Sequence, residues 1–503
     1  MIGASIRVVI AKKHTVRAGV KADEGVEQMD RLNLTMLTDF YELTMANGYF
    51  QNGLKDRTAY FDMFFREIPD GGGFAIMAGV EQLIEYLKNL KFTDEDIEYL
   101  RSRKIFSEEF LKYLKNFRFS CDVWTVPEGT PIFPSEPIVT VRGPITEAQF
   151  VETMVLLTIN HQSLIATKAN RIVRAAQGRP VMEFGSRRAQ GYDGAIYGAR
   201  AAYIGGCVGT ACTIADKEFG VPALGTMAHS WIQMFPSELE AFRGYARIYP
   251  DSCLLLVDTY NVLKSGIPNA IKVFNEEVVS RGFRPLGIRI DSGDIAYLSR
   301  EARKMLDEAG FKDCKIVASN ALDEYIIRDI LSQGAQIDQF GVGERLITSR
   351  SEPVFGGVYK LSAGEIIPKI KLSENVGKIT NPGFKQVWRL FDRKSGKAIA
   401  DVLANYDETI NEDKPYVLFD PVHTWKRKTV MDFRAERLLT RIFDKGTCVY
   451  ESPALKDIKA YCSRQLDTLW DEVKRFENPH KFYVDLSESL WEMKQRLLQQ
   501  YSA

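Results

Sequence analysis

The sequence predicts an α/β protein with an irregular β/α barrel at its centre. Between about Pro180 and Leu361 one order recurs: a short β-rich run, then a polar or glycine-rich turn, then a helical pattern. Strands that alternate with helices in this way form parallel βαβ units. The polar turns all follow strand ends, and a closed barrel brings those ends to one face. An open doubly wound sheet would gather fewer of them, so a barrel is favoured, irregular because fewer than eight units are counted.

The regions on either side of the predicted barrel show a different pattern of strands and helices. From about Leu32 to Gly143 apolar strand-like pieces alternate with a charged helical region, and a helical pattern follows from Glu147 to Arg174. Further along, Val387 to Phe391 and Ala398 to Leu403 are typical of a hairpin, and two amphipathic helical stretches come after it. We therefore divide the chain into a tail that is disordered or not native (1–30), an N-terminal domain (31–175), a catalytic barrel (176–368) and a C-terminal segment (369–503).

Composition narrows the class of protein. Lys plus Arg and Asp plus Glu are both 66, so the net charge is zero, which argues against a nucleic-acid or anionic-membrane binder. No apolar run is long enough to span a bilayer. The seven cysteines are scattered and form no CxxC pair, which is typical of reduced thiols rather than a zinc site or a disulfide framework. We expect a cytoplasmic protein without membrane or nucleic-acid partners.

One acidic turn follows a predicted strand. Asp291 and Asp294 flank Ser292 and Gly293 there, and such a cluster can hold Mg²⁺ or bind the hydroxyl groups of a sugar. Helix capping would explain one of the acids. It would not explain Arg289, which alternates with isoleucines on the preceding strand and, inside a barrel wall, requires an anion.

Further turns offer anion contacts, each with a plainer alternative. Ser319-Asn320 and Gly341-Val342-Gly343-Glu344 could present backbone amides to a phosphate, although most GxG turns bind nothing. Arg187 and Arg188 follow Phe184 and could clamp a phosphate or carboxylate, although adjacent arginines usually lie on a solvated surface.

A histidine stands in another such turn. His229 is one of only five histidines and follows Gly-Thr-Met-Ala. Taken alone, such a residue is more often a hydrogen-bonded core histidine than a catalytic group. The chain has no GxxxxGK[ST] loop, no GxSxG elbow and no HExxH motif, so P-loop, serine-hydrolase and zincin chemistry are not indicated.

Eight segments together resemble the nicotinate phosphoribosyltransferase family. They occur in the family's order from about Leu37 to Leu361, and more loosely to the C-terminus. They are "LTDFYELTMANGYF", "FDMFFREIPDGGGFAIMAGVE", "EFGSRRAQGYDGA", "LGTMAHSW", "LVDTY…SGIPNAI", "RIDSGD", "VASNALDE" and "GVGERLITS".

The resemblance implies a type II phosphoribosyltransferase fold, in which the barrel packs with a second α+β domain built from both ends of the chain. It also implies a homodimer with shared active sites. The activity implied is formation of nicotinate mononucleotide and pyrophosphate from nicotinate and phosphoribosyl pyrophosphate, the first step of NAD synthesis from nicotinate. The resemblance further implies that ATP is a co-substrate hydrolysed through a phosphohistidine, and that Mg²⁺ is the expected metal.

The resemblance also assigns roles to residues. His229 matches the phosphorylated residue, and Asp291 and Arg289 complete the expected catalytic set, with Asp291 able to reach the metal through water. Tyr41, from the partner subunit, and Phe184 are expected on the two faces of the pyridine ring. Thr226 and Arg289 are expected at the carboxylate of nicotinate. The residues expected near the sugar and phosphates are Arg187, Asp291, Ser319, Asn320, Gly341, Gly343 and Glu344.

One position departs from the family pattern. Glu344 stands where threonine is expected after the second glycine, and glutamate would repel a phosphate. Either Glu344 points away, or it acts through magnesium, or Thr348 takes the role.

Other activities remain open at this point. A nicotinamide or quinolinate phosphoribosyltransferase would share the fold, although quinolinate enzymes need extra cations and are typically much shorter. A non-catalytic metabolite sensor would not need His229, Arg289 and both aspartates. A barrel aldolase or phosphatase would need a lysine or metal-binding histidines at strand ends, which we do not find.

Overall fold

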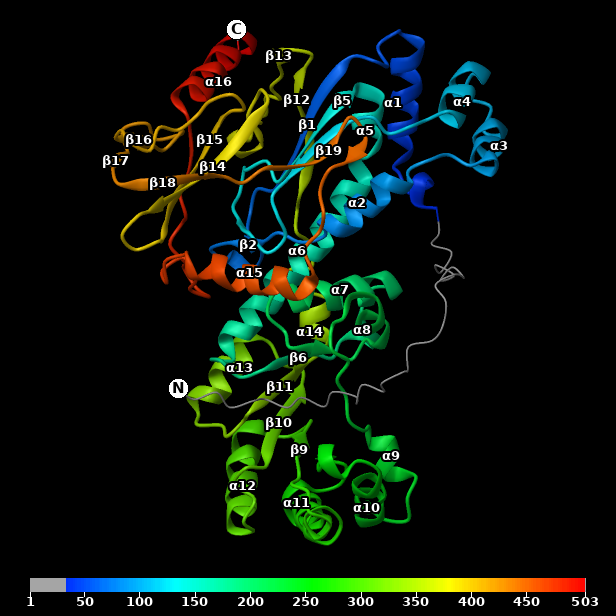
Figure 1. Cartoon of the computed structure of the whole chain (residues 1–503), viewed down its shortest axis with the longest axis vertical. Coiled ribbons are helices and arrows are strands. Elements are labelled where there is room, and N and C mark those ends of the chain that lie inside the picture. The colour runs from blue at the N-terminus through cyan, green and yellow to red at the C-terminus, as the bar shows by residue number, and fades with distance from the viewer. Residues whose placement is uncertain (1–32, 503) are drawn as a thin grey trace, which may run out of the picture. The chain divides into compact units, whose positions relative to one another are not determined.

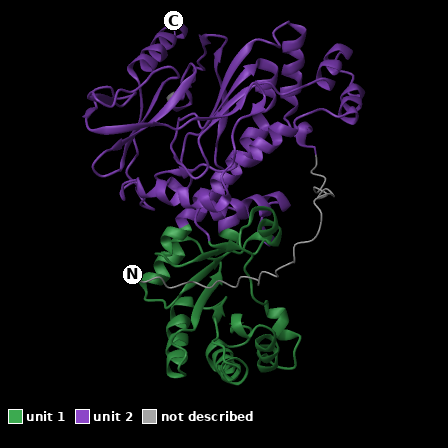
Figure 2. Cartoon of the chain, viewed as in Figure 1, with its two compact units in different colours: residues 1–32, 172–186, 208–345 green, residues 33–171, 187–207, 346–503 purple. Residues whose placement is uncertain are grey.

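The computed structural model of the chain describes residues 33–502 (Figure 1). The predicted tail, 1–30, lies outside the described residues. The chain divides into two compact units (Figure 2). Unit 1 contains residues 172–186 and 208–345, and unit 2 contains residues 33–171, 187–207 and 346–503.

Unit 1 is built on a parallel sheet, which confirms the predicted α/β class. Its six described strands follow the order β7-β6-β11-β10-β9-β8, and every pairing between them is parallel. Figure 1 shows β6, β11, β10 and β9 side by side. The strands are β6 (Val181–Glu183), β7 (Gly209–Thr210), β8 (Leu254–Leu256), β9 (Gly287–Ile290), β10 (Lys315–Asn320) and β11 (Gln339–Val342).

The described ladder has β7 and β8 at its two edges. Beyond β7, Ala223 forms one further parallel bridge with Thr210. Closure of this sheet into a barrel therefore stays a prediction.

Helices follow the strands of unit 1, as the repeated sequence order predicts. They are α8 (Thr213–Phe219), α9 (His229–Gln233), α10 (Glu238–Ile248), α11 (Ile267–Val273), α12 (Ile295–Glu308), α13 (Glu324–Ser332) and α14 (Glu344–Ile347), which begins at the end of the unit. Short polar side chains start several of them: Asp294 caps α12 by accepting a hydrogen bond from Tyr297 N at 2.9 Å. The apolar faces of α10, α11 and α12 and the strands β8 to β10 share a core that includes Phe242, Leu255 and Ile288.

Unit 2 joins the two ends of the chain, which confirms the second α+β domain. Its seven described sheet strands follow the order β13-β12-β1-β5-β3-β19-β20, so β1 from the N-terminal part lies between β5 and β12. A further sheet of four described strands, β18-β14-β15-β21, contains the predicted hairpin, now β14 and β15. The exact boundaries of the three predicted segments stay predictions.

The elements of unit 2 are as follows. The helices are α1 (Phe40–Gln51), α2 (Val80–Asn89), α3 (Asp94–Ser102), α4 (Glu108–Lys115), α5 (Ile145–Phe150), most of α6 (Glu152–Ala175), α7 (Tyr192–Ile204), α15 (Leu455–Asp467) and α16 (Glu488–Tyr501). The strands are β1 (Thr58–Phe64), β2 (Ala75–Ile76), β3 (Asp122–Thr125), β4 (Pro131–Ile132), β5 (Val139–Pro144), β12 (Val358–Gly364), β13 (Ile367–Pro368), β14 (Lys385–Asp392), β15 (Ala398–Asn405), β16 (Tyr416–Phe419), β17 (Arg427–Val430), β18 (Phe433–Arg437), β19 (Thr440–Asp444), β20 (Thr447–Cys448) and β21 (Val484–Leu486).

A buried ion pair crosses the four-stranded sheet of unit 2. Arg389 in β14 and Asp401 in β15 are both fully buried, and the guanidinium donates to the carboxylate from Nε at 2.8 Å and from Nη2 at 2.6 Å. Their bidentate geometry offsets the desolvation of two charges.

Within residues 33–502, no helix combines the length and the apolar character needed to cross a membrane.

Candidate active site

The carboxyl ends of four neighbouring strands carry most of the predicted site residues. The register aligns Ser319 of β10 with Gly341 of β11, and Val342 of β11 with Glu183 of β6. On the other side, β9 ends one residue before Asp291 and is aligned with β10. Parallel strands thus bring the polar turns of β6, β11, β10 and β9 to one edge of the sheet, where α/β proteins bind ligands.

Arg289 lies on β9 and contacts the turn that precedes His229. Its Nη1 donates to Thr226 Oγ1 at 2.7 Å, and its Nη2 donates to the Met227 carbonyl at 2.9 Å. The structure therefore brings together the two residues expected at the nicotinate carboxylate. A guanidinium beside a hydroxyl group suits a carboxylate ligand, because both can donate to its oxygens.

His229 is the first residue of α9, and its ring lies between two polar side chains. Nδ1 is 3.1 Å from Thr259 Oγ1, and Nε2 is 3.8 Å from Asp291 Oδ2. The side chains of His229 and Asp291 are 40% and 36% exposed, so the imidazole is accessible from solvent. The expected catalytic residues His229 and Asp291 are therefore neighbours in unit 1.

Two residues that the sequence analysis did not assign to the site hold this arrangement. Asp258 Oδ2 accepts hydrogen bonds from Asp291 N at 3.0 Å and from Ser292 Oγ at 2.6 Å, while Thr259 contacts His229. The signal was present in the sequence, because Asp258 and Thr259 follow the apolar run of β8 just as Asp291 and Ser292 follow β9.

The carboxylates of Asp258 and Asp291 are the candidate ligands for the expected magnesium ion. Asp258 is nearly buried, and its Oδ1 has no hydrogen-bond partner within residues 33–502. No group of three or more His, Cys, Asp or Glu side chains in that range could hold a metal ion. Mg²⁺ is commonly held by one or two carboxylates together with substrate phosphates and water, so Asp258 and Asp291 fit such a shared site.

The end of β10 adds a hydroxyl and a strained residue. Ser319, which is buried, donates from Oγ to Asp291 Oδ1. Asn320 adopts a φ of 131°, a conformation rare outside glycine, and its Oδ1 accepts from Ala321 N at 2.7 Å. Such strain tends to be found where side chains are held for function.

The glycine turn after β11 packs closely against Phe184. A Cβ atom on Gly341 would lie 2.5 Å from Phe184 Cδ2, and one on Gly343 would lie 3.2 Å from the Phe184 carbonyl oxygen. Phe184 N also donates to the Val342 carbonyl at 2.7 Å. These glycines thus have a packing role, whether or not they also contact a phosphate.

Glu344 and Thr348 lie at opposite ends of a short helix. Glu344 is the exposed first residue of α14, and Thr348 is the partly buried residue that follows it. Which of the two faces a phosphate stays a prediction.

Two expected site residues belong to unit 2. Tyr41 lies on α1 and is 44% exposed, and partial burial together with the neighbouring Glu152 carboxylate raises its pKa. Arg187 is an exposed residue of the short helix Ser186–Arg188. Both side chains are accessible to a ligand.

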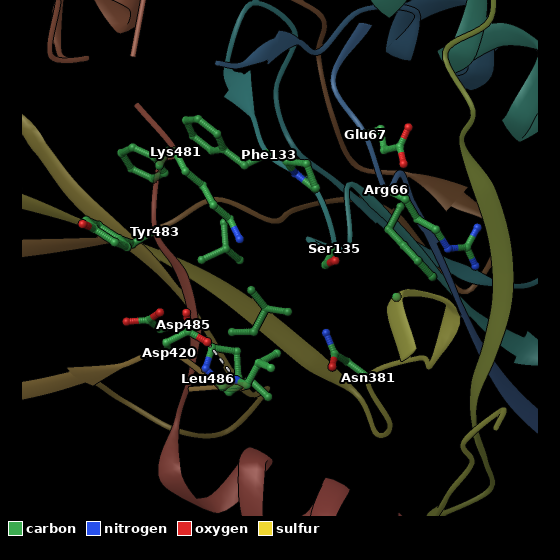
Figure 3. A pocket seen from close by; sticks show the side chains of 18 of the residues that line it. Arg66, Glu67, Phe133, Ser135, Asn381, Asp420, Lys481, Tyr483, Asp485 and Leu486 are labelled. Atoms are coloured by element: carbon green, nitrogen blue, oxygen red, sulfur yellow. Dashed lines mark hydrogen bonds between the residues drawn. The ribbon is translucent and has the colours of Figure 1, made fainter. Parts of the chain in front are cut away.

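Unit 2 also contains a cavity of about 1650 Å³, which the sequence analysis did not predict (Figure 3). Asp420 and Asp485 lie together on one wall, and Arg66 and Glu67 lie on another. Burial and the neighbouring Asp420 raise the pKa of Asp485 to about 7. The walls come from segments far apart in the sequence, so no local pattern could have revealed the cavity, and no expected site residue lines it.

Comparison with known proteins identifies the family. Three family models match the chain: the nicotinate phosphoribosyltransferase N-terminal domain over residues 36–160, the nicotinate phosphoribosyltransferase family over 180–391, and the C-terminal domain over 384–494. The nicotinate phosphoribosyltransferase of Bacillus subtilis (strain 168) is 44% identical over 466 residues, covering 92% of this chain and 94% of the relative. The one from Homo sapiens is 30% identical over 512 residues, covering 90% and 95%.

Solved structures agree. The crystal structure of human nicotinic acid phosphoribosyltransferase superposes with a TM-score of 0.83 at 29% identity, covering 92% of this chain and 99% of that chain. Nicotinate-nucleotide pyrophosphorylase from Pyrococcus furiosus shares the fold, with a TM-score of 0.68 at 23% identity and 90% and 99% coverage. With family models and relatives that span most of its length, the chain belongs to the nicotinate phosphoribosyltransferase family.

Proposed function

We propose that the chain forms nicotinate mononucleotide and pyrophosphate from nicotinate and phosphoribosyl pyrophosphate, and that it couples this reaction to ATP hydrolysis through His229. Family membership supports the transfer reaction, which is the first step of NAD synthesis from nicotinate. The observation that carries the ATP-coupled mechanism is the accessible imidazole of His229, which lies beside Asp291, next to the Arg289–Thr226 pair.

The transfer is a substitution at the anomeric carbon of the ribose. The pyridine nitrogen forms the new C–N bond with its own lone pair, and the C–O bond to pyrophosphate breaks. No general base is needed, so catalysis comes from positioning and from stabilising the departing pyrophosphate. In this proposal Phe184 stacks on the ring, while Arg289 and Thr226 hold the carboxylate.

The proposed phosphorylation uses Nε2 of His229. If Nδ1 carries the proton and donates a hydrogen bond to Thr259 Oγ1, Nε2 keeps its lone pair for the γ-phosphoryl group of ATP. ADP leaves, and later attack of water on the phosphohistidine releases inorganic phosphate. The phosphoryl group adds negative charge beside Asp291 while it is present, which changes how the site binds phosphoribosyl pyrophosphate.

Magnesium would neutralise phosphate charge in this site. Asp258 and Asp291 are the side chains that we propose hold it, either directly or through water. Asp258 also accepts a hydrogen bond from the Asp291 backbone, which links the two turns that carry these carboxylates.

Three further proposals concern the surroundings of the reaction. We propose a homodimer in which Tyr41 of one copy covers the pyridine ring bound by the other. We propose that the remaining residues expected at the sugar and phosphates, Arg187, Ser319, Asn320, Gly341, Gly343 and Glu344, act there. We also propose a reducing, cytoplasmic setting, in keeping with the free cysteines of the described structure.

Replacing His229 tests the coupling. We expect His229→Ala to form nicotinate mononucleotide at a rate that ATP no longer stimulates, and to incorporate no acid-labile phosphate from labelled ATP. Stimulation of the variant equal to that of the parent protein would refute the phosphohistidine. Turnover of nicotinamide or quinolinate in preference to nicotinate would favour the sister activities, and binding without turnover of any of them would favour a sensor.

A further inference from the structure

Glu183 is a buried acid at the edge of the site that the proposed reaction does not use. It is the last residue of β6, and its side chain is fully buried. Its carboxylate accepts hydrogen bonds from Gly185 N and from Thr210 Oγ1, the latter at 2.5 Å. Both of these partners in the described structure are neutral, and burial raises the pKa of the carboxyl group.

The first hydrogen bond closes a tight turn around Phe184. Gly185 N lies directly after Phe184 and is tied back to Glu183. Phe184 N is held by the Val342 carbonyl at 2.7 Å, and the ring lies where a Cβ on Gly341 would clash with it. The backbone amides of Phe184 and Gly185 are therefore both held, and the ring packs against Gly341.

The second hydrogen bond reaches the segment that leads to His229. The Thr210 hydroxyl also accepts a hydrogen bond from Cys212 N at 3.0 Å. The backbone of Thr210 donates from N to the Pro222 carbonyl at 3.0 Å and accepts at its carbonyl from Leu224 N at 2.8 Å. Two residues after Leu224 comes Thr226, which accepts from Arg289. One carboxyl group thus joins the turn of Phe184 to β7, whose Thr210 binds the segment that leads to Thr226.

We propose that Glu183 is a positioning residue, which sets the distance between the ring-stacking face at Phe184 and the carboxylate-binding pair of Thr226 and Arg289. An apolar side chain of similar size would fill the volume but leave Gly185 N and the Thr210 hydroxyl without their acceptor. Burying a carboxyl group without a cationic partner is unfavourable. Its presence is explained if the two hydrogen bonds define the spacing that nicotinate requires. The proposal rests on the proposed function, because it assumes that Phe184 and Thr226 contact nicotinate.

The test compares Glu183→Ala and Glu183→Gln in the full-length chain. Glutamine can accept from Gly185 N and donate to Thr210 Oγ1, so we expect it to keep the KM for nicotinate within about threefold of the parent. We expect Glu183→Ala to raise this KM about tenfold or more, with a smaller change in kcat, because two hydrogen bonds that align the binding groups are lost.

A matched control separates positioning from general stability. Glu238 is a nearly buried acid of the same unit, the first residue of α10, and accepts a hydrogen bond from Asn269 Nδ2 at 2.9 Å. We expect Glu238→Ala to lower the melting temperature without raising the KM for nicotinate. If Glu183→Ala leaves that KM unchanged, or raises it no more than Glu238→Ala does, the proposal is wrong.

Two more variants keep the outcome decisive. If Glu183→Ala does not fold, Thr210→Val removes one of the two donors with little change of shape, and we expect it to raise the KM, whereas Thr210→Ser restores it. An unchanged KM in Thr210→Val would then overturn the proposal. Phe184→Ala, measured in parallel, reports on the proposed function: if it leaves the KM for nicotinate unchanged, the stacking role of Phe184 is wrong and the positioning proposal falls with it.

Discussion

Single side chains decide what the edge of the parallel sheet can bind. Arg289 contributes a guanidinium held against the neutral acceptors of Thr226 and Met227, while Asp258 and Asp291 contribute carboxylates on the neighbouring turns. A ligand with a carboxylate at one end and phosphates that bind magnesium at the other complements both groups. Nicotinate together with phosphoribosyl pyrophosphate meets this description.

Replacing Arg289 tests the carboxylate contact. We expect Arg289→Gln to raise the KM for nicotinate by about 10- to 100-fold, because a hydrogen bond to a charged group typically contributes about 1.5–3 kcal/mol. The KM for phosphoribosyl pyrophosphate should change much less. Steady-state kinetics with each substrate varied in turn measures both values.

The control for this variant is Arg247→Gln, which removes an exposed arginine of the same unit that pairs with Glu277. We expect its kinetics to match those of the parent protein. An equal KM for nicotinate in Arg289→Gln and Arg247→Gln would contradict the contact.

Elements place these side chains through close packing as much as through hydrogen bonds. Strand β11 lies between β6 and β10, and its Gly341 leaves room for the ring of Phe184. Glycine is required at position 341 because the ring approaches too closely for a Cβ atom. The backbone conformation is not the reason, because the φ of Gly341 lies outside the left-handed region. Gly341 therefore allows the ring of Phe184, which is proposed to stack on the pyridine ring, to pack directly against β11.

Gly341→Ala tests this packing. The new methyl group would meet Phe184 atoms at 2.5 and 2.6 Å, so the ring or the strand must shift, at about 1–3 kcal/mol of stability. We expect a lower melting temperature and a higher KM for nicotinate. Gly48→Ala is the comparison: a Cβ there meets nothing within 4 Å, and in α1 it should raise helix stability by up to about 1 kcal/mol. Equal melting temperatures in the two variants would be inconsistent with a packing role for Gly341.

At the scale of the whole molecule, unit 2 contains acids whose burial makes stability depend on pH. Burial raises the pKa of Glu42 to about 7, against the hydrogen bonds it accepts from Thr153 and Thr38, and the pKa of Asp485 is also raised to about 7. The carboxyl groups of Glu42 and Asp485 therefore bind a proton more tightly in the folded chain than in the unfolded chain.

The sign of the pH effect follows from that difference. Between the ordinary carboxyl pKa near 4 and the raised value near 7, folding takes up protons, so the free energy of unfolding falls as pH rises through this range. A rise of about three pKa units would correspond to about 4 kcal/mol for a fully buried group, and partial exposure to solvent reduces this, so we expect each acid to account for about 2 kcal/mol of that fall. Chemical denaturation between pH 4.5 and 7.5 measures it, and Glu42→Gln and Asp485→Asn should each flatten the curve. A slope identical to that of the parent in both variants would contradict the assignment.

The proposed sharing of active sites is a second property of the assembled molecule. His229→Ala as a pure protein should lack the ATP-stimulated part of the activity, and Tyr41→Ala as a pure protein should show little of it. If Tyr41 acts on the partner's site, mixed dimers of the two variants regain one intact site, and ATP-stimulated activity returns after they are unfolded and refolded together. Absence of recovery, with mixed dimers confirmed by mass spectrometry, would mean that Tyr41 and His229 serve the same copy's site.

The sequence predicted the α/β class, the parallel strands and the join of both chain ends in unit 2. It succeeded because strand patterns and strand-end turns are local, and because eight ordered segments resemble one family. Asp258 and Thr259 were not assigned to the site, although they follow β8 as Asp291 follows β9, because their importance depends on contacts with His229 and Asp291 across the sheet. The cavity in unit 2 and the two links of Glu183 also depend on segments far apart in the sequence.

The position of β1 in its sheet has a consequence for synthesis on the ribosome. One edge of β1 pairs with β5, which is made before residues 172–186 and 208–345 of unit 1, but the other edge pairs with β12, which emerges only after those residues. Until then the nascent chain presents an open row of backbone donors and acceptors, the kind of edge that recruits other chains. Chaperones that shield extended segments during translation should therefore raise the yield of active protein more than those that act only after release.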